Sequence, residues 1–244
     1  MCNAIVSDII AAMTKDYKRA LIVGAGTGLS ASLARVFVRE GMAVALAARS
    51  TGKLDALATA TGAHAFPCDA SDAEAVARLF ADVERDMGAP DVFVYNASGR
   101  LRGPLATLAP DEVERAIKVS AFGGFLVAQQ AAMRMLPNSH GAIFFTGASA
   151  SIKGFAGSAA FAMGKFALRG LAQSMARELS PKGIHVAHFI IDGAIRNPGR
   201  TEAPDKPDSM LDPDAIAETY IATLRQPRSA WSFEVELRPW VETF

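Results

Sequence analysis

Cysteine, histidine and net charge are what this sequence lacks, and each shortage excludes a class of protein. The 244 residues include 2 cysteines and 4 histidines, and 25 basic side chains balance 25 acidic ones. Cys2 and Cys68 are too few for a disulfide framework and fit a reducing compartment. Without excess positive charge, nothing indicates a partner such as nucleic acid or an anionic membrane. No cluster of histidine, cysteine or acidic residues has the spacing of metal ligands, so we expect no metal site.

Long apolar runs are also missing. No segment reaches the ~18 apolar residues that cross a bilayer. In residues 1–18 an aspartate, Asp8, interrupts the apolar run and no basic segment precedes it, which does not suit a signal peptide. We therefore expect a cytoplasmic protein with no membrane partner. Residues 1–18 are interpreted as a short N-terminal extension, followed by one domain over residues 19–244.

The residues that are present predict an α/β protein. Half of them are hydrophobic, enough for a large core. Short β-type runs alternate with longer helical runs, which predicts a single-domain Rossmann fold with a doubly wound parallel sheet of about seven strands and helices on both faces. The expected strands are Ala20–Val23, Ala43–Ala47, Ala63–Phe66, Val92–Tyr95, Ala142–Thr146, His185–Ile191 and Phe233–Leu237. The expected helices are Leu29–Glu40, Lys53–Thr59, Ser71 or Asp72 to Met87, Asp111–Met135, Ser158–Leu179 and Asp214–Leu224.

A glycine-rich turn joins the first strand to the first helix. Glycines let the backbone turn tightly and approach a pyrophosphate, while the helix N-terminus supplies free N–H groups and positive dipole. Placed between a buried strand and an amphipathic helix, such a turn indicates a dinucleotide site. The residues expected to contact the cofactor here are Gly24, Gly26, Thr27, Gly28 and Leu29.

The end of the second strand indicates which dinucleotide is bound. This position lies beside the adenosine ribose in a Rossmann fold, where a carboxylate would hold the ribose hydroxyls. The sequence has Arg49 and Ser50 there, and a guanidinium can hold a 2′-phosphate. We therefore expect NADP(H), with NAD(H) less favoured; the alternative is a solvated surface arginine. An S-adenosylmethionine methyltransferase is a rival interpretation, but it calls for an acidic residue where Arg49 stands.

Further motifs follow the later strands, and together they resemble the short-chain dehydrogenase/reductase family over nearly the whole chain. Val23-Gly24-Ala25-Gly26-Thr27-Gly28-Leu29-Ser30 resembles its glycine motif, and Cys68-Asp69-Ala70 resembles its adenine-contacting segment. Asn96-Ala97-Ser98-Gly99 resembles its Asn-Asn-Ala-Gly turn, and residues 160–165 its Tyr-x-x-x-Lys segment. Residues 190–195 resemble its Pro-Gly stretch. The resemblance adds the following to the expected cofactor contacts: Asp69, Ala70, Asn96, Ala97, Ser98, Lys165 and Ile195.

The resemblance also shows which catalytic groups have changed. The family reduces carbonyls with a tyrosine that gives the proton, a lysine, a serine and an asparagine. Lys165 matches the lysine, whereas Phe161 stands at the tyrosine position and Ser120 at the asparagine position. The serine position is Ala148, with Ser149 next to it. Because general acid catalysis is typically worth about 10²–10⁴-fold, this member would need another proton donor.

Three substitutes for the tyrosine are open. Ser149 can orient a carbonyl and relay a proton from water, and it ranks first. Ser158 lies seven residues before Lys165, where the family's enoyl reductases place a tyrosine. Lys165 can itself deliver a proton if burial lowers its pKa. Tyr95, at a strand end, is interpreted as a packing residue.

Two functions follow from these observations. The first is an NADP-dependent oxidoreductase that acts on a carbonyl or an activated double bond through an altered proton-delivery site. The second is a catalytically silent NADP(H)-binding sensor or partner subunit. An apolar small-molecule substrate is expected from nearby residues, which could also be core: Phe155, Phe161, Met163 and Phe166.

Two features concern the surroundings of the site. The irregular, proline-broken stretch Asn197–Asp212 is expected to be a substrate lid, although it could be a connection without function. The resemblance implies a homodimer or homotetramer through the helices Asp111–Met135 and Ser158–Leu179. Small residues at Gly123-Gly124 and Ala159-Ala160 would let helices of two subunits approach closely, unless they are buried within one chain.

Overall fold

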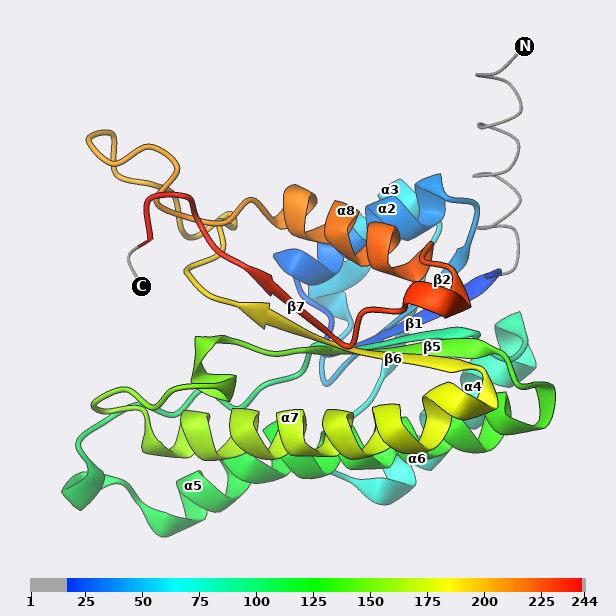
Figure 1. Cartoon of the computed structure of the whole chain (residues 1–244), viewed down its shortest axis with the longest axis horizontal. Helices are drawn as coiled ribbons and strands as arrows, with labels where there is room; N and C mark the ends of the chain where they lie inside the picture. The colour runs from blue at the N-terminus through cyan, green and yellow to red at the C-terminus, as the bar shows by residue number, and fades with distance from the viewer. Residues whose placement is uncertain (1–16, 243–244) are drawn as a thin grey trace.

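Seven parallel strands form one sheet across the middle of the molecule in the computed structural model, which describes residues 17–242 (Figure 1). Their order is β3-β2-β1-β4-β5-β6-β7. Strands β1 to β3 are added toward one edge of the sheet and β4 to β7 toward the other, so the order of addition reverses between β1 and β4. This confirms the doubly wound Rossmann-type sheet. The strands are β1 Arg19–Val23, β2 Ala43–Ala48, β3 His64–Pro67, β4 Val92–Tyr95, β5 Gly141–Thr146, β6 Ile184–Ile191 and β7 Glu234–Leu237.

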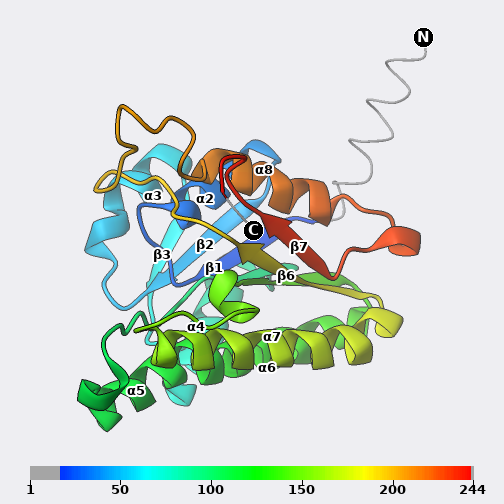
Figure 2. The ribbon, with the colours of Figure 1, turned by 60° about the vertical axis from the view of Figure 1, so that its left-hand side comes forward.

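Helices cover both faces of this sheet (Figures 1 and 2). On one face lie α2 Leu29–Arg39, α3 Asp55–Thr61 and α8 Pro213–Leu224. On the other lie α4 Ala73–Met87, α5 Pro110–Ile117, α6 Gly123–Met135 and α7 Ala159–Leu179. Successive strand residues point to opposite faces, so Ile22 of β1 joins the core beneath α2 and α8, whereas Leu21 joins the core beneath α4, α6 and α7. The strands are therefore continuous apolar runs, as expected for a buried parallel sheet.

The long helix expected over Asp111–Met135 is interrupted. A π-helical turn, Lys118–Phe122, separates α5 from α6. Wider turns free backbone groups from the α-helical ladder, and here the Tyr95 hydroxyl donates a hydrogen bond to the Val119 carbonyl. Periodicity could not show this turn because the partner that stabilises it comes from β4.

Two smaller features refine the predicted boundaries. Helix α4 is capped by Asp72, whose carboxylate accepts hydrogen bonds from the backbone N–H groups of Glu74 and Ala75. Ser71 instead donates its hydroxyl hydrogen bond to Asp69. Residues 1–16, most of the expected N-terminal extension, lie outside the described residues. Within residues 17–242, no helix combines the length and apolar character needed to span a membrane.

Candidate active site

The glycine-rich turn lies at the carboxyl end of β1, at the point where the strand order reverses. Gly24 has a φ of +87°, and a Cβ on it would lie 2.3 Å from the Ala97 backbone nitrogen. Only glycine therefore lets the turn after β1 approach the turn after β4 so closely. A crevice outside the strand ends at such a reversal is where open α/β sheets bind ligands.

The N-terminus of α2 opens onto this crevice without a competing anion. Gly28 is its N-cap, no side chain caps it, and its first turn contains no acidic residue. A Cβ at Gly26 would meet no atom within 4 Å, so the space in front of the turn is open. The unpaired N–H groups and the positive end of the helix dipole make this terminus a suitable anion site.

Ser30, a departure from the family's glycine motif, links the two turns. Asn96 donates a side-chain hydrogen bond to the Ser30 hydroxyl at 2.7 Å, and that hydroxyl donates to the Gly24 carbonyl at 3.3 Å. Ser30 is buried. The replacement of glycine therefore leaves the turn braced by hydrogen bonds, and sequence reasoning had assigned Ser30 no role.

Basic side chains stand at the end of β2. Arg49 is exposed, and no described residue forms a hydrogen bond or ion pair with its guanidinium. Lys53, which the sequence analysis did not single out, lines the same crevice. The Asp69 carboxylate of the same lining accepts two hydrogen bonds from Ser71, which lower its pKa, and Arg49 lowers it further.

The crevice encloses a cavity of about 620 Å³. The residues predicted to contact a cofactor that line it are Gly24, Gly26, Gly28, Leu29, Arg49, Asp69, Ala70, Asn96, Ala97, Ser98 and Ile195. Thr27 and Ser50 are exposed and lie outside its lining, because their side chains face solvent. Lys165 belongs to a neighbouring cavity. Basic residues of the lining that sequence reasoning missed are Lys53, Arg100, Arg196 and Arg200.

A second cavity of about 810 Å³ adjoins the first. Both are lined by Asn96, Ser98, Arg100, Ile195 and Arg200. The Ser98 hydroxyl oxygen, at this boundary, is buried without a hydrogen-bond partner among the described residues. The second cavity is formed by the segments after β4, β5 and β6 and by the start of α7, so the carboxyl ends of three neighbouring strands bring its residues together.

Lys165 lies in the wall of this second cavity. Only 3% of the residue is exposed, and its ammonium donates a hydrogen bond to the Thr146 carbonyl at 2.7 Å. Burial, with a smaller contribution from Arg100, lowers the lysine pKa to about 7. A group with that pKa can both take up and release a proton near neutral pH.

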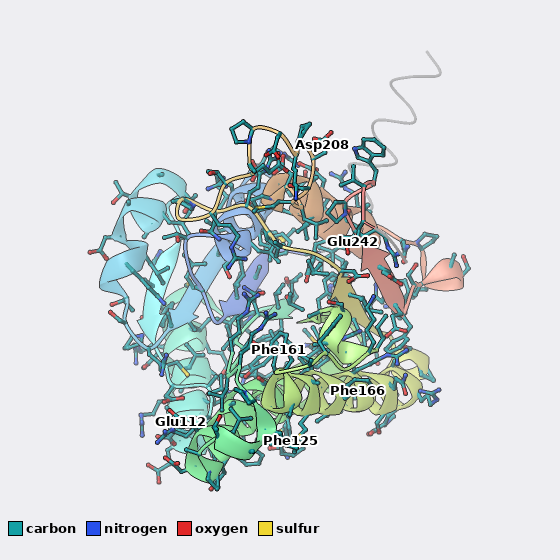
Figure 3. All side chains as sticks on the ribbon, turned by 90° about the vertical axis from the view of Figure 1, so that its left-hand side faces the viewer. Glu112, Phe125, Phe161, Phe166, Asp208 and Glu242 are labelled. Atoms are coloured by element: carbon teal, nitrogen blue, oxygen red, sulfur yellow. The ribbon has the colours of Figure 1, made fainter. Side chains whose placement is uncertain are left out.

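Phe161 occupies the centre of the strand-end face (Figure 3). Its ring lines the second cavity, with the Lys165 ammonium 5.9 Å and the Arg100 Cζ atom 5.8 Å from its centroid. The phenyl ring has no proton to give. The two serines considered as substitutes, Ser149 and Ser158, also line this cavity, as does Ala148.

Ser120 and Tyr95 lie outside both cavities. Ser120, in the π-helical turn, is fully buried and its hydroxyl accepts a hydrogen bond from the Gly99 N–H at 2.9 Å. A Cβ on Gly164 of α7 would lie 2.7 Å from the Ser120 Cβ, so this serine packs in the scaffold. Tyr95 is buried and its hydroxyl is engaged by Val119, which confirms the packing interpretation.

Of the residues taken as signs of an apolar substrate, Phe155 and Phe161 line the second cavity. Met163 and Phe166 do not, because the helical spacing of α7 turns them to the outer face, where they are 55% and 45% exposed.

The histidines also lie outside the lining of the second cavity. Among residues 17–242, no group of three or more His, Cys, Asp or Glu side chains could hold a metal ion.

The fold and the crevice define an α/β protein of the dinucleotide-binding class, and comparison with known proteins specifies the family. The family model described as short chain dehydrogenase matches residues 18–206. The chain belongs to this family of oxidoreductases, which sets the methyltransferase interpretation aside. It is 30% identical over 175 residues to the 3-oxoacyl-[acyl-carrier-protein] reductase MabA of Mycobacterium bovis, covering 72% of this chain and 68% of that one.

Solved structures agree with this assignment. A short-chain dehydrogenase from Rhodopseudomonas palustris is 35% identical, with a TM-score of 0.78 over 91% of this chain and 99% of that one. A metagenomic short-chain oxidoreductase in complex with NADP is 30% identical, with a TM-score of 0.79 over 92% of this chain and 98% of that one. The similarity thus extends through the strands that carry the crevice and the second cavity.

Proposed function

We propose that this protein is an NADP(H)-dependent oxidoreductase that acts on a carbonyl or an activated double bond through an altered proton-delivery site. The observation that carries the proposal is the continuity of the two cavities: a crevice suited to a dinucleotide opens into a space walled by a buried lysine. The NADP complex of the metagenomic relative supports the choice of cofactor.

The residues present fit a phosphorylated dinucleotide. The Gly24 turn and the α2 N-terminus would hold the pyrophosphate, and Arg49 and Lys53 would hold the 2′-phosphate. Asp69 and Asn96 lie further along the same lining. When bound, the nicotinamide supplies or accepts a hydride.

The chain's own groups would then manage the proton and the substrate oxygen. Lys165, with its pKa near 7, holds an exchangeable proton at its ammonium. Ser149 lines the cavity and is the first choice to orient the substrate oxygen and relay a proton, and Ser158 is the second. Phe161 closes the wall where the family's tyrosine would stand.

A catalytically silent NADP(H)-binding protein, acting as a sensor or partner subunit, is the second candidate. Phe161 and Ala148 favour it because neither side chain can donate or accept a hydrogen bond. Both functions require the same crevice, so cofactor binding alone does not separate them.

Two measurements test these proposals. Calorimetric titration with NADPH, NADP⁺, NADH and NAD⁺ should show tighter binding of the phosphorylated pair; no heat with any of them would overturn both functions. NADPH oxidation is then followed with ketones, aldehydes and enones for the wild type and for the double variant Phe161→Tyr/Ala148→Ser. Turnover by the wild type supports altered proton delivery, whereas turnover by the double variant alone supports the silent protein.

We also propose that the stretch after β6 closes over the bound ligands as a lid. Asn197 and Arg200 of that stretch line the crevice, which favours the lid over a connection without function.

We further propose that the chain forms a homodimer or homotetramer. Phe125 on α6 and Phe166 on α7 are exposed apolar side chains that a second subunit would cover (Figure 3). The glycines expected to help subunits approach pack within one chain: a Cβ on Gly123 would lie 2.5 Å from the Tyr95 hydroxyl, and one on Gly124 2.5 Å from Leu168.

A further inference from the structure

Three arginines meet at the mouth of the second cavity. Arg100 and Arg102 come from the segment after β4, and Arg200 comes from the segment after β6. These segments reach the same cavity because β4 and β6 end at the same edge of the sheet, with only β5 between them. The guanidinium groups of Arg102 and Arg200 are close enough to Arg100 to lower its pKa, after the larger effect of partial burial.

None of these arginines forms an ion pair within the described part of the chain, although acids and bases are equal in number in the sequence. Other cations beside the cavities form ion pairs. The Arg196 guanidinium lies 2.6 Å from the Asp212 carboxylate, and the Lys153 ammonium lies 3.6 Å from the Asp192 carboxylate. All three arginines are exposed, so water screens part of their mutual repulsion, but a bound anion would reduce it further and accept charged hydrogen bonds from them.

The acidic side chains of the cavity do not cancel this charge. Asp192 is already near two cations, Lys153 and Arg238, each at 3.6 Å. Glu242 is the other carboxylate of the lining, and it forms no ion pair with the arginines. Among the described residues of this lining, Glu242 is the one carboxylate without a cation partner, and it is outnumbered by the three guanidinium groups. This part of the cavity is therefore electropositive.

Arg100 also has a defined place relative to the reaction centre. Its guanidinium lies over the Phe161 ring, and Lys165 approaches the same ring. A cation over an aromatic face is held in position by the ring's electrons. An anionic group bound by Arg100 would therefore lie beside the Phe161 ring that Lys165 also approaches, in the cavity that Ser149 lines.

We propose that the second cavity binds a small substrate that carries an anionic oxygen group, a carboxylate or a phosphate, and that Arg100, Arg102 and Arg200 hold that group. The inference deepens the proposed function, on which it rests for the nature of the reacting group, by naming the substrate class. It replaces the expectation of a purely apolar substrate: Phe155 and Phe161 contact the carbon part, and the arginines select its charge.

The test uses three aromatic probes of similar size: benzoate, phenyl phosphate and benzyl alcohol. Calorimetry is performed on the whole protein, first alone and then with saturating NADP⁺. We expect at least one anionic probe to bind about 10-fold or more tightly than benzyl alcohol, since a charged hydrogen bond is worth that much or more. The anion that binds more tightly identifies carboxylate or phosphate as the preferred group.

Arg100→Gln should weaken binding of the preferred anion by about 10- to 100-fold and leave benzyl alcohol unchanged. Arg177→Gln, which removes an exposed arginine at the far end of α7, is the matched control and should change neither. Circular dichroism verifies that each variant is folded. Arg102→Gln and Arg200→Gln provide independent variants if Arg100→Gln does not fold.

The outcomes separate this inference from the proposed function. Binding of NADP⁺ without preference for either anion overturns the inference and leaves the oxidoreductase proposal standing. Anion binding that disappears when NADP⁺ is saturating also overturns it, because the arginines would then serve the cofactor crevice. Arginine-dependent anion binding in a protein that gives no heat with NADP⁺ supports the anion site and overturns the proposed function.

Discussion

The ammonium of Lys165 donates a hydrogen bond to the backbone carbonyl of Thr146 at 2.7 Å, at the end of β5. This contact joins α7 to the central sheet and holds the lysine in the cavity wall with almost no access to water. A single neutral acceptor does not compensate for lost hydration of a charge, so the lysine pKa falls to about 7. Lys165, the residue expected to move a proton, therefore also destabilises the folded protein when its ammonium is charged.

The unfavourable burial of this charge predicts that the stability of the protein depends on pH. The lysine pKa is about 7 in the folded protein and near its ordinary 10.5 in the unfolded chain. Between these values the unfolded chain binds a proton that the folded protein has released, so the free energy of unfolding rises with pH by up to about 1.4 kcal/mol per unit. Urea denaturation from pH 7 to 10 should show this rise in the wild type relative to Lys165→Met.

Lys182→Met is the control for that measurement, because Lys182 is an exposed lysine paired with Glu178. Its unfolding free energy should follow the wild type across the same pH range. If Lys165→Met also follows the wild type, the lysine keeps an ordinary pKa in the folded protein and its role as a proton carrier near neutral pH loses its basis.

The close approach of Gly24 to Ala97 predicts a position that accepts no side chain. In Gly24→Ala, the positive φ alone should cost about 1–3 kcal/mol, and the Cβ would push the β1 and β4 turns apart. We expect a lower melting temperature and no calorimetric binding of NADPH. Gly26→Ala in the same turn, where a Cβ meets no neighbour, should keep the melting temperature; an equal loss in both variants would contradict the argument.

The preference for a phosphorylated cofactor should depend on Arg49. In Arg49→Gln, loss of a charged hydrogen bond to the 2′-phosphate should weaken NADP⁺ by about 10-fold or more, while NAD⁺ affinity stays the same. Lys53→Gln should act in the same direction. Fluorescence titration with both coenzymes measures the ratio, and Arg85→Gln, an exposed arginine of α4 paired with Asp82, is the charge-matched control. Equal weakening of NADP⁺ and NAD⁺ would remove Arg49 as the selecting residue.

The outer face of α6 and α7 should bind a second copy of the chain. Phe125 and Phe166 are 41% and 45% exposed, and large apolar side chains that leave water on association favour an oligomer. Size exclusion with light scattering should show a dimer or tetramer that Phe125→Glu/Phe166→Glu converts to monomers. Trp240→Glu, an exposed aromatic outside these helices, should not change the mass. A monomeric wild type would contradict the proposal.

Local patterns were enough to predict the sheet and most helix ends. Each strand is a run of apolar residues because both faces are covered, and Asp72 and Pro213 mark the starts of helices by local chemistry. The glycine turn was predictable for the same reason: it needs only a strand before it and a helix after it. Arg49 follows from its place at the end of a strand.

Other features depend on residues far apart in the chain, and the sequence alone could not indicate them. The π-helical turn depends on Tyr95, and the role of Ser30 depends on Asn96. Met163 and Phe166 share helix α7 with Lys165, yet packing against the sheet decides that the lysine faces the cavity and the other two face outward.

The amino-acid order by itself determined the α/β architecture and the dinucleotide crevice, because each of these is encoded in local runs and spacings, and it placed a phenylalanine at position 161. Only the tertiary structure decided that Arg100, Arg102 and Arg200 share one cavity with Lys165, and that Lys165 is buried enough to lose its proton near pH 7. Charge clustering and loss of water are properties of the packed molecule. They arise where strands that are distant in the sequence end at the same edge of the sheet.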